Sequence, residues 1–276
     1  MLDLDTIIAA ALAEDVGHGD LTTAAVVPDD ARCRARVVAK EDGVLSGMRV
    51  FRGVFEALGG DFDWQTREDG QPFGAGDTLA EGEGATGVVL RGERVALNFL
   101  QRLSGVATIT AAFVEAVEGT GCRICDTRKT TPLLRALEKQ AVRHGGGYNH
   151  RFGLFDAILI KENHVIAAGG VKEAVTRARA AASHMIKIQV EVETLEEFEE
   201  ALAAGPDSIL LDNMGLEEMR EAVSRLGSQR VVLEASGNMT MERVRQVAET
   251  GVHVISAGAL THSARSIDLS MLIEQV

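Results

Sequence analysis

The chain has 276 residues and a formal net charge of −13 at pH 7, which is enough sequence to bury a large core in one or two domains. Hydrophobic residues make up 46% of it and charged residues 25%, as in globular proteins. An acidic surface repels a phosphate backbone, and no apolar run approaches the roughly 20 residues that span a bilayer. The amino terminus also lacks the basic segment of a signal peptide. We therefore expect a cytoplasmic protein that binds neither nucleic acid nor membranes.

The first part of the chain predicts a short helix, a β-rich region and then a long helix. Residues 1–17 form an apolar segment with acidic residues near its start, as in a capped helix. Residues 30–90 alternate polar and apolar side chains between glycine-rich turns, which is typical of strands. Residues 92–121 repeat apolar residues at helical spacing, and Gly119 with Gly121 supply a stop.

From residue 122 onward, apolar strand candidates alternate with amphipathic helices. Thr194 precedes one of these helices as its N-cap, with Glu197 completing a capping box, and Thr240 caps a later helix in the same way. Pro132 is placed to open the helix that follows the first strand. The strand candidates span residues 123–129, 156–164, 187–193, 207–213, 231–238 and 253–260.

Repeated strand–helix units predict a parallel sheet with right-handed crossovers. Each strand candidate ends in polar or small residues, and in α/β barrels the active site forms where the parallel strands end. Six strands, or at most seven, fall short of the eight of a complete barrel. We therefore expect an α/β fold with an irregular, incomplete TIM-like barrel. The glycine motifs of dinucleotide and P-loop sites do not occur.

Cysteine and histidine usage excludes several other kinds of site. Three cysteines give no disulfide framework. Cys122 and Cys125 form a C-x-x-C pair, but residues three apart on a strand face opposite sides, so these thiols could not share a metal. No H-E-x-x-H motif and no G-x-S-x-G elbow occurs, which disfavours zinc and serine hydrolases.

The acidic chain becomes locally basic between residues 123 and 161, where eight cationic residues face three acidic ones, 8 − 3 = +5. Cations that converge at strand ends fit carboxylates and phosphates, although any one of them alone could simply form a surface salt bridge. The strand-end group consists of Arg128, Lys129, Arg151 and Lys161, with His150 beside Arg151. The charges on the intervening helix are better interpreted as scaffold or interface charges: Arg135, Lys139 and Arg143.

Two further groups of strand-end residues complete the expected site. Glu193 and Asp212 close neighbouring strands, where carboxylates could bind Mg²⁺, hydrogen-bond ribose hydroxyls or stabilise a cationic transition state. The alternative is that they neutralise Lys161 and Lys129. Small residues end the last strands, where backbone N–H groups can approach a phosphate: Ser236, Gly237, Asn238 and Gly258.

At these residues the chain resembles the nicotinate-nucleotide pyrophosphorylase (carboxylating) family, also called quinolinate phosphoribosyltransferase. The resemblance covers nearly the full length, and its eight motifs occur in order. They are EDVGHGDLTT at 14–23, GERVALNFLQRLSGVAT at 92–108, DTRKTTP at 126–132, KQAVRHGGGYNHRFGLFDAILIKENH at 139–164, VEVE at 190–193, LLDN at 210–213, EASGN at 234–238 and ISAGALTHS at 255–263.

The resemblance implies a phosphoribosyl transfer in de novo NAD biosynthesis. Quinolinate and 5-phosphoribosyl-1-pyrophosphate would give nicotinate mononucleotide, pyrophosphate and CO₂, with Mg²⁺ and no organic cofactor. The implied fold is an N-terminal α/β open sandwich, expected at residues 1–106 with the tail 266–276 packing on it, joined to the irregular barrel at 107–265. The implied assembly is a homodimer, or a higher oligomer, in which each N-terminal domain covers its partner's barrel mouth.

The resemblance also implies roles for residues, by motif match. The four strand-end cations, Arg128, Lys129, Arg151 and Lys161, would bind the quinolinate carboxylates and nearby phosphate oxygens. The segments 236–238 and 257–259 would cradle the 5′-phosphate. Catalysis would involve Lys129, Lys161, Glu193 and Asp212, of which the two carboxylates would hold Mg²⁺ with the substrate's pyrophosphate. The full set of substrate-binding residues is Arg94 from the neighbouring subunit, Thr127, Arg128, Lys129, His150, Arg151, Lys161, Ser236, Gly237, Asn238, Ala257, Gly258 and Ala259.

Two positions depart from the family's pattern, and three alternatives stay open. Leu133 and Asn238 stand where glycine is common in the family, although asparagine tolerates left-handed backbone angles.

One alternative is a paralogue of the same fold that acts on another pyridine or unknown acceptor, such as the molybdenum-utilisation relatives. Another is a Schiff-base aldolase with Lys161 as nucleophile. The third is a non-catalytic sensor of phosphoribosyl metabolites.

Overall fold

The computed structural model describes residues 3–59 and 62–276. The chain forms two compact units, and the first combines three stretches: Met1–Ala111, Thr131–Gly146 and Ala264–Val276. The second consists of Ala112–Thr130 and Gly147–Ser263. The domain bounds expected from the sequence stay a prediction; the compact units differ from them in that residues 131–146 belong with the first. Within the described ranges, no helix is both long and apolar enough to cross a membrane.

The first unit contains an antiparallel sheet with the strand order β12-β1-β5-β3. The carboxyl-terminal strand lies at one edge, where Ala35 pairs with Ile273 across the β1–β12 ladder. A small antiparallel pair, β2 and β4, accompanies this sheet. The strands are β1 (Arg32–Ala39), β2 (Gly43–Val44), β3 (Asp63–Thr66), β4 (Pro72–Phe73), β5 (Thr78–Ala85) and β12 (Leu269–Gln275).

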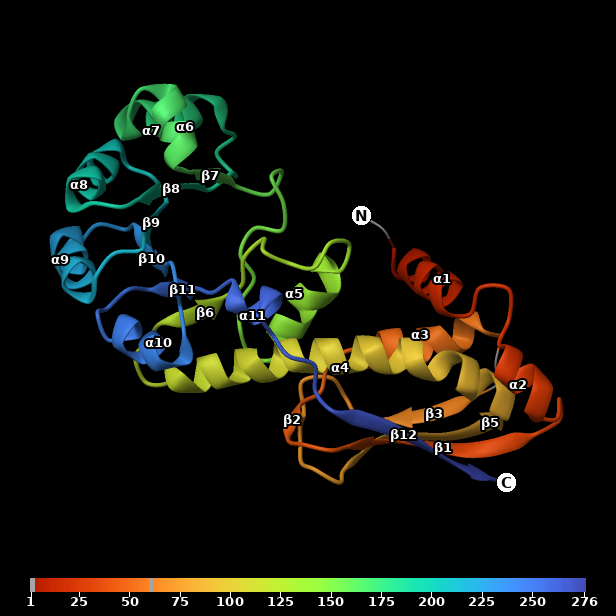
Figure 1. Ribbon diagram of the computed structural model, residues 1–276. Helices are drawn as coiled ribbons and strands as arrows, with labels where there is room; N and C mark the ends of the chain where they lie inside the picture. The colour runs from red at the N-terminus through yellow and green to blue at the C-terminus, as the bar shows by residue number, and fades with distance from the viewer. Residues whose placement is uncertain (1–2, 60–61) are drawn as a thin grey trace. The chain divides into compact units, whose positions relative to one another are not determined.

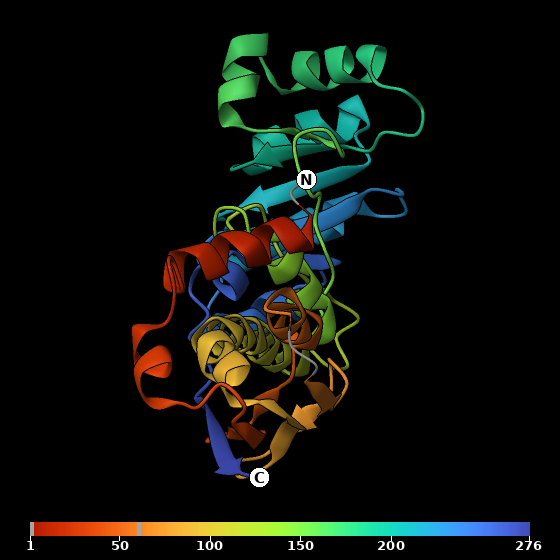
Figure 2. The ribbon, with the colours of Figure 1, turned by 90° about the vertical axis from the view of Figure 1, so that its right-hand side faces the viewer.

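Helices cover one face of that sheet, and Figure 2 looks almost along α4, which lies on it beside α3. The predicted helix near residue 92 is α4 (Thr86–Ala116), which begins six residues earlier than expected. The sequence did not predict α3 (Met48–Ala57), whose buried Val50, Phe51, Val54 and Phe55 recur at helical spacing. The other helices of this unit are α1 (Leu4–Asp15), α2 (Leu21–Val26) and α5 (Arg135–His144).

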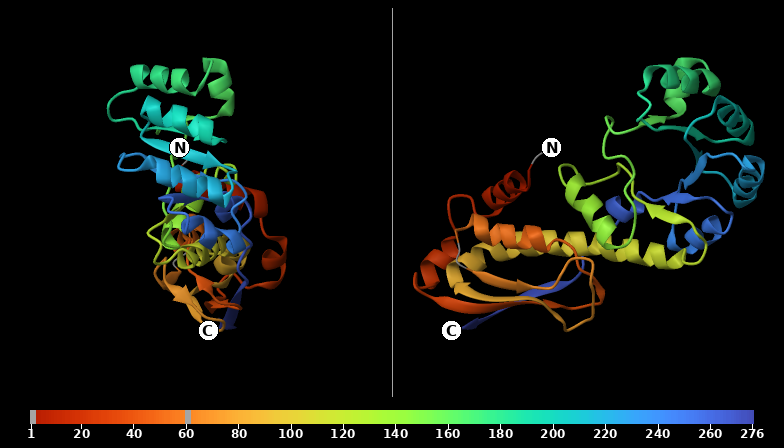
Figure 3. Two further views of the ribbon diagram at one scale, coloured as in Figure 1. Left: turned by 90° about the vertical axis from the view of Figure 1, so that its left-hand side faces the viewer. Right: turned by 180° about the vertical axis from the view of Figure 1, so that it is seen from behind.

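The second unit contains the six predicted strands in one parallel sheet, in the order β6-β11-β10-β9-β8-β7. The strands are β6 (Arg123–Cys125), β7 (Ile158–Ile160), β8 (Ile188–Val192), β9 (Ser208–Asp212), β10 (Val232–Ser236) and β11 (Val254–Ser256). Figures 1 and 3 show the sheet curving inside a row of helices. These are α6 (Glu162–Ala168), α7 (Val171–Ala181), α8 (Leu195–Ala204), α9 (Leu216–Leu226) and α10 (Met241–Ala248), with the short α11 (Ala259–His262) after the last strand.

The strand order is that of an incomplete barrel, as predicted. Strands from β7 to β11 neighbour one another in chain order, and β6, the first of the six, lies beside β11, the last. In the described part of the chain no ladder joins β6 to β7, and the free side of β6 forms only an isolated bridge from Cys125 to Tyr148. The expected α/β fold with an irregular TIM-like barrel is therefore confirmed.

Some helix ends differ from the predictions for local reasons. Leu133 has a φ of +67°, and this left-handed residue prevents the helix from opening at Pro132; it begins at Arg135 instead. The Thr194 hydroxyl accepts the N–H of Glu197 as predicted, but the Glu197 carboxylate accepts the N–H of Glu193 and not that of the cap residue. Thr240 precedes α10 without a side-chain hydrogen bond to its backbone.

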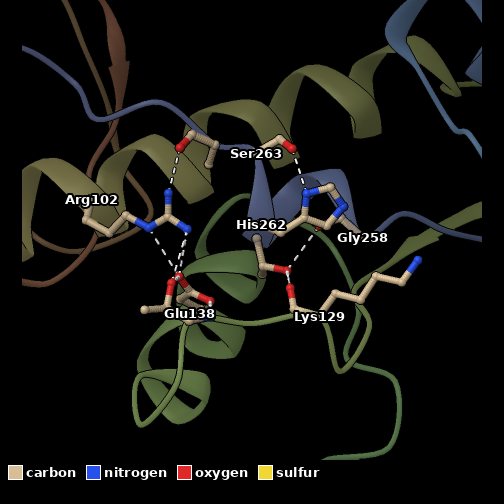
Figure 4. Close-up of polar contacts among 9 residues, drawn as sticks. Arg102, Lys129, Glu138, Gly258, His262 and Ser263 are labelled. Atoms are coloured by element: carbon tan, nitrogen blue, oxygen red, sulfur yellow. Dashed lines mark hydrogen bonds and ion pairs between the residues drawn. The ribbon is translucent and has the colours of Figure 1, made fainter.

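A buried ion pair in the first unit holds two loops. The Glu138 side chain is fully buried and accepts from Arg102 of α4 through Nη2 at 2.8 Å (Figure 4). The same carboxylate accepts both the N–H and the hydroxyl of Thr131, at 3.0 and 2.7 Å. Arg102 Nη1 donates to the carbonyl oxygen of Ala264 at 2.6 Å. The pair therefore fixes the chain just after Lys129 and just after α11.

Candidate active site

A cavity of about 590 Å³ lies where the strands of the parallel sheet end, and this volume is in the range of small-molecule sites. Thirteen residues predicted from the sequence line it: Thr127, Arg128, Lys129, His150, Arg151, Lys161, Asp212, Ser236, Gly237, Asn238, Ala257, Gly258 and Ala259. Two predicted residues are absent from the lining. Arg94 is exposed on α4 in the first unit, and Glu193 is exposed just after β8.

Two guanidinium groups approach each other in this cavity. Burial and the nearby charge of Arg128 together lower the pKa of Arg151, and Asp156 opposes this only in part. Arg151 Nη1 donates to the carbonyl oxygen of Ala157 at 2.9 Å, whereas its Nε is buried and has no hydrogen-bond partner in the structure. Two cations that repel each other gain stability when an anion binds between them. The geometry therefore favours an anionic ligand.

The turn after β6 presents Lys129. The Thr127 hydroxyl accepts the Lys129 N–H at 3.0 Å, and the buried Thr261 hydroxyl donates to the Lys129 carbonyl oxygen at 2.7 Å. Figure 4 shows the Lys129 side chain extended beside Gly258 and His262. A Cβ on Gly258 would lie 2.9 Å from Lys129 Cδ, so a larger residue there would displace the lysine. The turn thus couples the lysine to the loop after β11.

Lys161 and Glu191 form an ion pair on the wall of the cavity. Lys161 follows β7, and its Nζ lies 2.6 Å from Glu191 Oε2. Glu191 lines the cavity, but sequence reasoning chose Glu193 two residues later. Residues two apart on a strand share a face, so the alternation places Gln189, Glu191 and Glu193 together and gave the sequence no means of choosing between the two glutamates. Glu193 continues this alternation beyond the strand end and is exposed.

Five carboxylates, with Glu193 among them, gather near the ends of β7, β8 and β9. Burial and the negative charges of Glu162, Asp212, Glu197 and Glu191 raise the pKa of Glu193. Carboxylates crowded in this way are oxygen ligands suited to a hard divalent cation. In the described ranges, no group of three or more His, Cys, Asp or Glu side chains could hold a metal ion by itself. A divalent cation at this position would take its remaining ligands from water or from a substrate.

The loop after β10 has a constrained backbone. Gly237 has a φ of +95° and Asn238 a φ of +45°, so asparagine does adopt the left-handed conformation expected of it. A Cβ on Gly237 would lie 2.1 Å from Asn213 Oδ1, and Asn213 donates its own N–H to the Ser236 carbonyl oxygen. Arg243 of α10 donates to the carbonyl oxygen of Met214 at 2.9 Å. The loops that follow β9 and β10 are thus held together by contacts between the backbone of one and side chains of the other.

The short helix α11 begins inside the cavity. Gly258 is its N-cap, and Ala259 begins the helix directly after β11. The first N–H groups of a helix lack intrahelical partners and favour negative charge, as at the phosphate sites of barrels. Together with Ser236–Asn238, which end and follow the neighbouring strand β10, these residues line the part of the cavity called the cradle below.

Below these loops lies a buried polar group that the sequence did not single out. Glu234 is 5% exposed and accepts from Gln189 Nε2 at 2.8 Å, and Gln189 Oε1 lies 3.0 Å from His150 Nε2. Burial alone would raise the pKa of Glu234, but its interactions with His150, Ser256 and Gln189 outweigh burial and lower it. Glu234 lies within β10, and its place in the strand segment EASGN gave no sign that its side chain belongs to the site.

The cysteines take no part in the site. All three are buried free thiols. Burial raises the pKa of Cys122 to about 11, so this thiol is unreactive at neutral pH. The helix charges interpreted as scaffold belong to α5 of the first unit, where Lys139 is buried.

We expect Gly237→Ala to damage the cradle, because the new methyl group meets Asn213. Gly119→Ala is the matched control: Gly119 has a φ of +79°, but no atom lies within 4 Å of the position that a Cβ would take there. Left-handed strain alone should cost Gly119→Ala about 1 kcal/mol of unfolding free energy, and Gly237→Ala about 3 kcal/mol. Urea unfolding measures both, and equal losses would show that the contact with Asn213 is unimportant.

Comparison with known proteins gives a consistent result over both parts of the chain. The family model "Quinolinate phosphoribosyl transferase, N-terminal domain" matches residues 20–104, and the corresponding C-terminal domain model matches residues 106–272. The probable carboxylating nicotinate-nucleotide pyrophosphorylase of Bacillus subtilis is 46% identical over 261 residues, covering 94% of this chain and 89% of that protein. The corresponding enzyme of Mycobacterium leprae is 42% identical over 270 residues, covering 96% and 95%.

Solved structures agree. NadC from Streptococcus pyogenes superposes with a TM-score of 0.95 at 44% identity, covering 99% of this chain and 97% of that one. The nicotinate-nucleotide pyrophosphorylase of Ehrlichia chaffeensis gives 0.94 at 37% identity, covering 99% of both. The resemblance inferred from the eight motifs is thereby confirmed, and the chain belongs to the quinolinate phosphoribosyltransferase family.

Proposed function

We propose that this chain transfers phosphoribose from 5-phosphoribosyl-1-pyrophosphate to quinolinate and decarboxylates the product to nicotinate mononucleotide, a step of de novo NAD biosynthesis. The observation that carries this proposal is that a guanidinium pair and a backbone phosphate cradle line one cavity, with Glu191 and Asp212 on its wall. A dicarboxylate acceptor and a phosphorylated donor need these two kinds of recognition side by side. We also propose that the enzyme is cytoplasmic and needs no organic cofactor.

Arg128 and Arg151 are proposed to bind the two carboxylates of quinolinate. Guanidinium forks match carboxylates in geometry, and the mutual repulsion that lowers the pKa of Arg151 is relieved when a dianion binds. A pyridine with one carboxylate would neutralise only part of this charge. Thr127 and His150 line the same part of the cavity.

The donor is proposed to bind with its 5′-phosphate between Ser236–Asn238 and Ala257–Ala259. Backbone N–H groups bind phosphate without bringing a titrating charge, and the glycines allow close approach. Lys129 lies next to this cradle, since its side chain would contact any Cβ at Gly258. The lysine is thus placed to contact the phosphates of the donor.

The reaction needs charge stabilisation more than covalent catalysis. The ring nitrogen of quinolinate forms a bond to C1′ as the bond from C1′ to pyrophosphate breaks, and positive charge develops on the ribose. Glu191 and Asp212 would stabilise this charge, and Lys129 with Lys161 would stabilise the departing pyrophosphate. The positive charge of the new pyridinium nitrogen then stabilises the electron pair that stays on C2 when the C2 carboxylate departs as CO₂, and this pair takes up a proton. The Lys161 ion pair with Glu191 disfavours the aldolase alternative, because a Schiff base needs a neutral amine.

The carboxylates near β8 and β9 fit Mg²⁺ as the family implies. Glu191 and Asp212 line the cavity and supply oxygen ligands, and Glu193, the residue expected from the sequence, lies close enough for their charges to raise its pKa. When bound with the substrate's pyrophosphate, the ion would neutralise the leaving group. We assign the inner ligands to Glu191 and Asp212 and an outer electrostatic role to Glu193.

The proposed assembly is a homodimer, with higher oligomers possible, in which Arg94 reaches the neighbouring subunit's site. Arg94 is exposed on α4 and belongs to the first unit, whereas every residue that lines the cavity belongs to the second. An exposed arginine in a family motif gains a function if it meets the anions bound by another copy.

The purified protein should release CO₂ from carboxyl-labelled quinolinate only when both 5-phosphoribosyl-1-pyrophosphate and Mg²⁺ are present. Removal of divalent cations with EDTA should abolish the release, and added Mg²⁺ should restore it. Nicotinate in place of quinolinate should give no pyrophosphate, because it leaves one guanidinium unpaired. Turnover with nicotinate but not with quinolinate would contradict the proposed substrate.

Glu191→Gln should lower kcat/KM by about a hundredfold, because a ligand and counter-charge inside the cavity is lost. Glu193→Gln is the matched control two residues away, and its effect should be less than about fivefold, since an exposed charge acts only through solvent. The Mg²⁺ concentration for half-maximal activity should rise for the first variant only. The reverse order of effects would return the ligand role to Glu193.

A mixture of Arg94→Ala and Lys161→Ala proteins, each inactive, should recover about a quarter of wild-type activity after subunit exchange. Half of the dimers would be mixed, and each mixed dimer has one complete site if Arg94 acts across the interface. A mixture of Arg151→Ala and Lys161→Ala proteins should recover no activity. In a mixed dimer each subunit then carries a change in its own barrel, so neither site is complete. No recovery in the first mixture would place Arg94 outside the neighbouring site.

A further inference from the structure

A chain of buried hydrogen bonds runs beneath the guanidinium pair, across strands β8 and β10. Gln189 Nε2 donates to Glu234 Oε2 at 2.8 Å and to the Ser208 hydroxyl at 3.1 Å. His150 Nε2 lies 3.0 Å from Gln189 Oε1, and His150 Nδ1 accepts the backbone N–H of Arg151 at 2.8 Å. Gln189 is 8% exposed and Glu234 5%, so water competes little for these groups.

The donor and acceptor roles along this chain follow from its ends. An ionised carboxylate only accepts hydrogen bonds, so Glu234 requires that Gln189 turn its amide NH₂ toward it. The Ser208 hydroxyl donates to the Val232 carbonyl oxygen at 2.9 Å, which leaves its oxygen to accept from the same NH₂. Both neighbours therefore hold Gln189 in one orientation, with Oε1 directed at His150.

Two acceptors near Nε2 set the tautomer of His150: Gln189 Oε1 at 3.0 Å and Glu234 Oε2 itself at 3.5 Å. Oε1 accepts only from a protonated Nε2, so the neutral imidazole carries its hydrogen there and Nδ1 is left as an acceptor. Nδ1 then accepts the Arg151 N–H. The opposite tautomer would set an N–H of the ring against the N–H of Arg151, and this contact would be repulsive.

We propose that Glu234 is a positioning residue which, through Gln189 and the His150 tautomer, fixes the backbone of Arg151 in the anion-binding cavity. The proposal rests on the function proposed above, because it assigns Arg151 to a substrate carboxylate. Arg151 is held at two points, the N–H by His150 and the guanidinium by the Ala157 carbonyl oxygen at 2.9 Å. Loss of the hydrogen bond from the Arg151 N–H to His150 frees this backbone. The repulsion between the Arg128 and Arg151 guanidinium groups then favours their separation.

Glu234→Gln tests this relay. It keeps the size of the side chain and replaces a carboxylate, which only accepts hydrogen bonds, by an amide that can also donate them. The amide that replaces the Glu234 carboxylate can donate to Gln189, which lets the Gln189 amide reverse and offer its NH₂ to His150. Nitrogen NMR of the ¹⁵N-histidine-labelled, ligand-free protein at pH 8 reports which ring nitrogen of His150 is protonated, with a His150→Gln sample to assign its signals. We expect Nε2–H alone in the wild type and a mixture of tautomers in the variant.

The effect on Arg151 has two further readouts. In ligand-free Glu234→Gln protein, exchange of the Arg151 amide hydrogen should be at least about tenfold faster, because its acceptor is lost for part of the time. The calorimetric Kd for quinolinate should rise about tenfold, the size expected for one lost charge-linked hydrogen bond. If quinolinate does not bind the wild type at all, the proposed function fails, and the tautomer and exchange measurements still decide the relay.

Two variants separate positioning from simple loss of charge or stability. Gln189→Glu combined with Glu234→Gln moves the carboxylate next to His150 and should restore the Nε2–H tautomer and most of the quinolinate affinity at pH 8. Asp207→Asn is the matched control: Asp207 accepts the N–H of Ile188, beside Gln189, but has no part in the relay. It should change stability and leave the tautomer unchanged. A single unchanged tautomer in Glu234→Gln, or a changed tautomer with unaltered Arg151 exchange, would overturn the proposal.

Discussion

The central physical constraint on this protein is that its cavity must hold repelling cations together before any anion arrives. Burial and the nearby charge of Arg128 both lower the pKa of Arg151, so keeping this arginine charged has a cost in free energy while no anion is bound. Local counter-charges reduce that cost: Glu191 pairs with Lys161, and Asp156 acts on Arg151. A bound dianion removes the repulsion between the cations, and the free energy gained in this way contributes to the affinity for the dianion. Ligand binding should therefore also stabilise the fold.

Buried carboxylates position the loops that carry these cations. Asp126 is fully buried and accepts the N–H of His150 at 2.9 Å, while Glu138 accepts from Thr131 and Arg102. Glu234 acts on Arg151 through His150, which it contacts both directly and by way of Gln189. In each case an acceptor-only group leaves its donors one arrangement, which is why a loop can be held as firmly as a helix. The acidic composition of the chain is thus partly internal scaffold.

The sequence predicted the six parallel strands, the incomplete barrel and most of the lining of the cavity, because strand ends are marked by polar and small residues. It failed where the signal depends on side-chain direction or on backbone angle. Glu191 and Glu193 look equivalent in VEVE, and only the end of β8 at Val192 distinguishes them. The left-handed conformation of Leu133 was indicated only by the glycine common at this position in the family, and the helix after it was placed too early. Glu234 was missed because its partners lie 45 and 84 residues away in the chain.

The open barrel distributes rigidity unevenly across the site. Strands β9 and β10, whose ends carry Asp212 and the phosphate cradle, have hydrogen-bonded neighbours on both sides, while β6 and β7 lie at the two edges of the sheet. Of the residues assigned to the acceptor, Arg128 follows β6 and Arg151 lies in the segment that leads into β7. A substitution in an edge strand disturbs the hydrogen bonds to one neighbouring strand, whereas a substitution in a central strand disturbs the hydrogen bonds to two. Recognition of the acceptor therefore depends on the edges of the sheet, and recognition of the sugar donor depends on its centre.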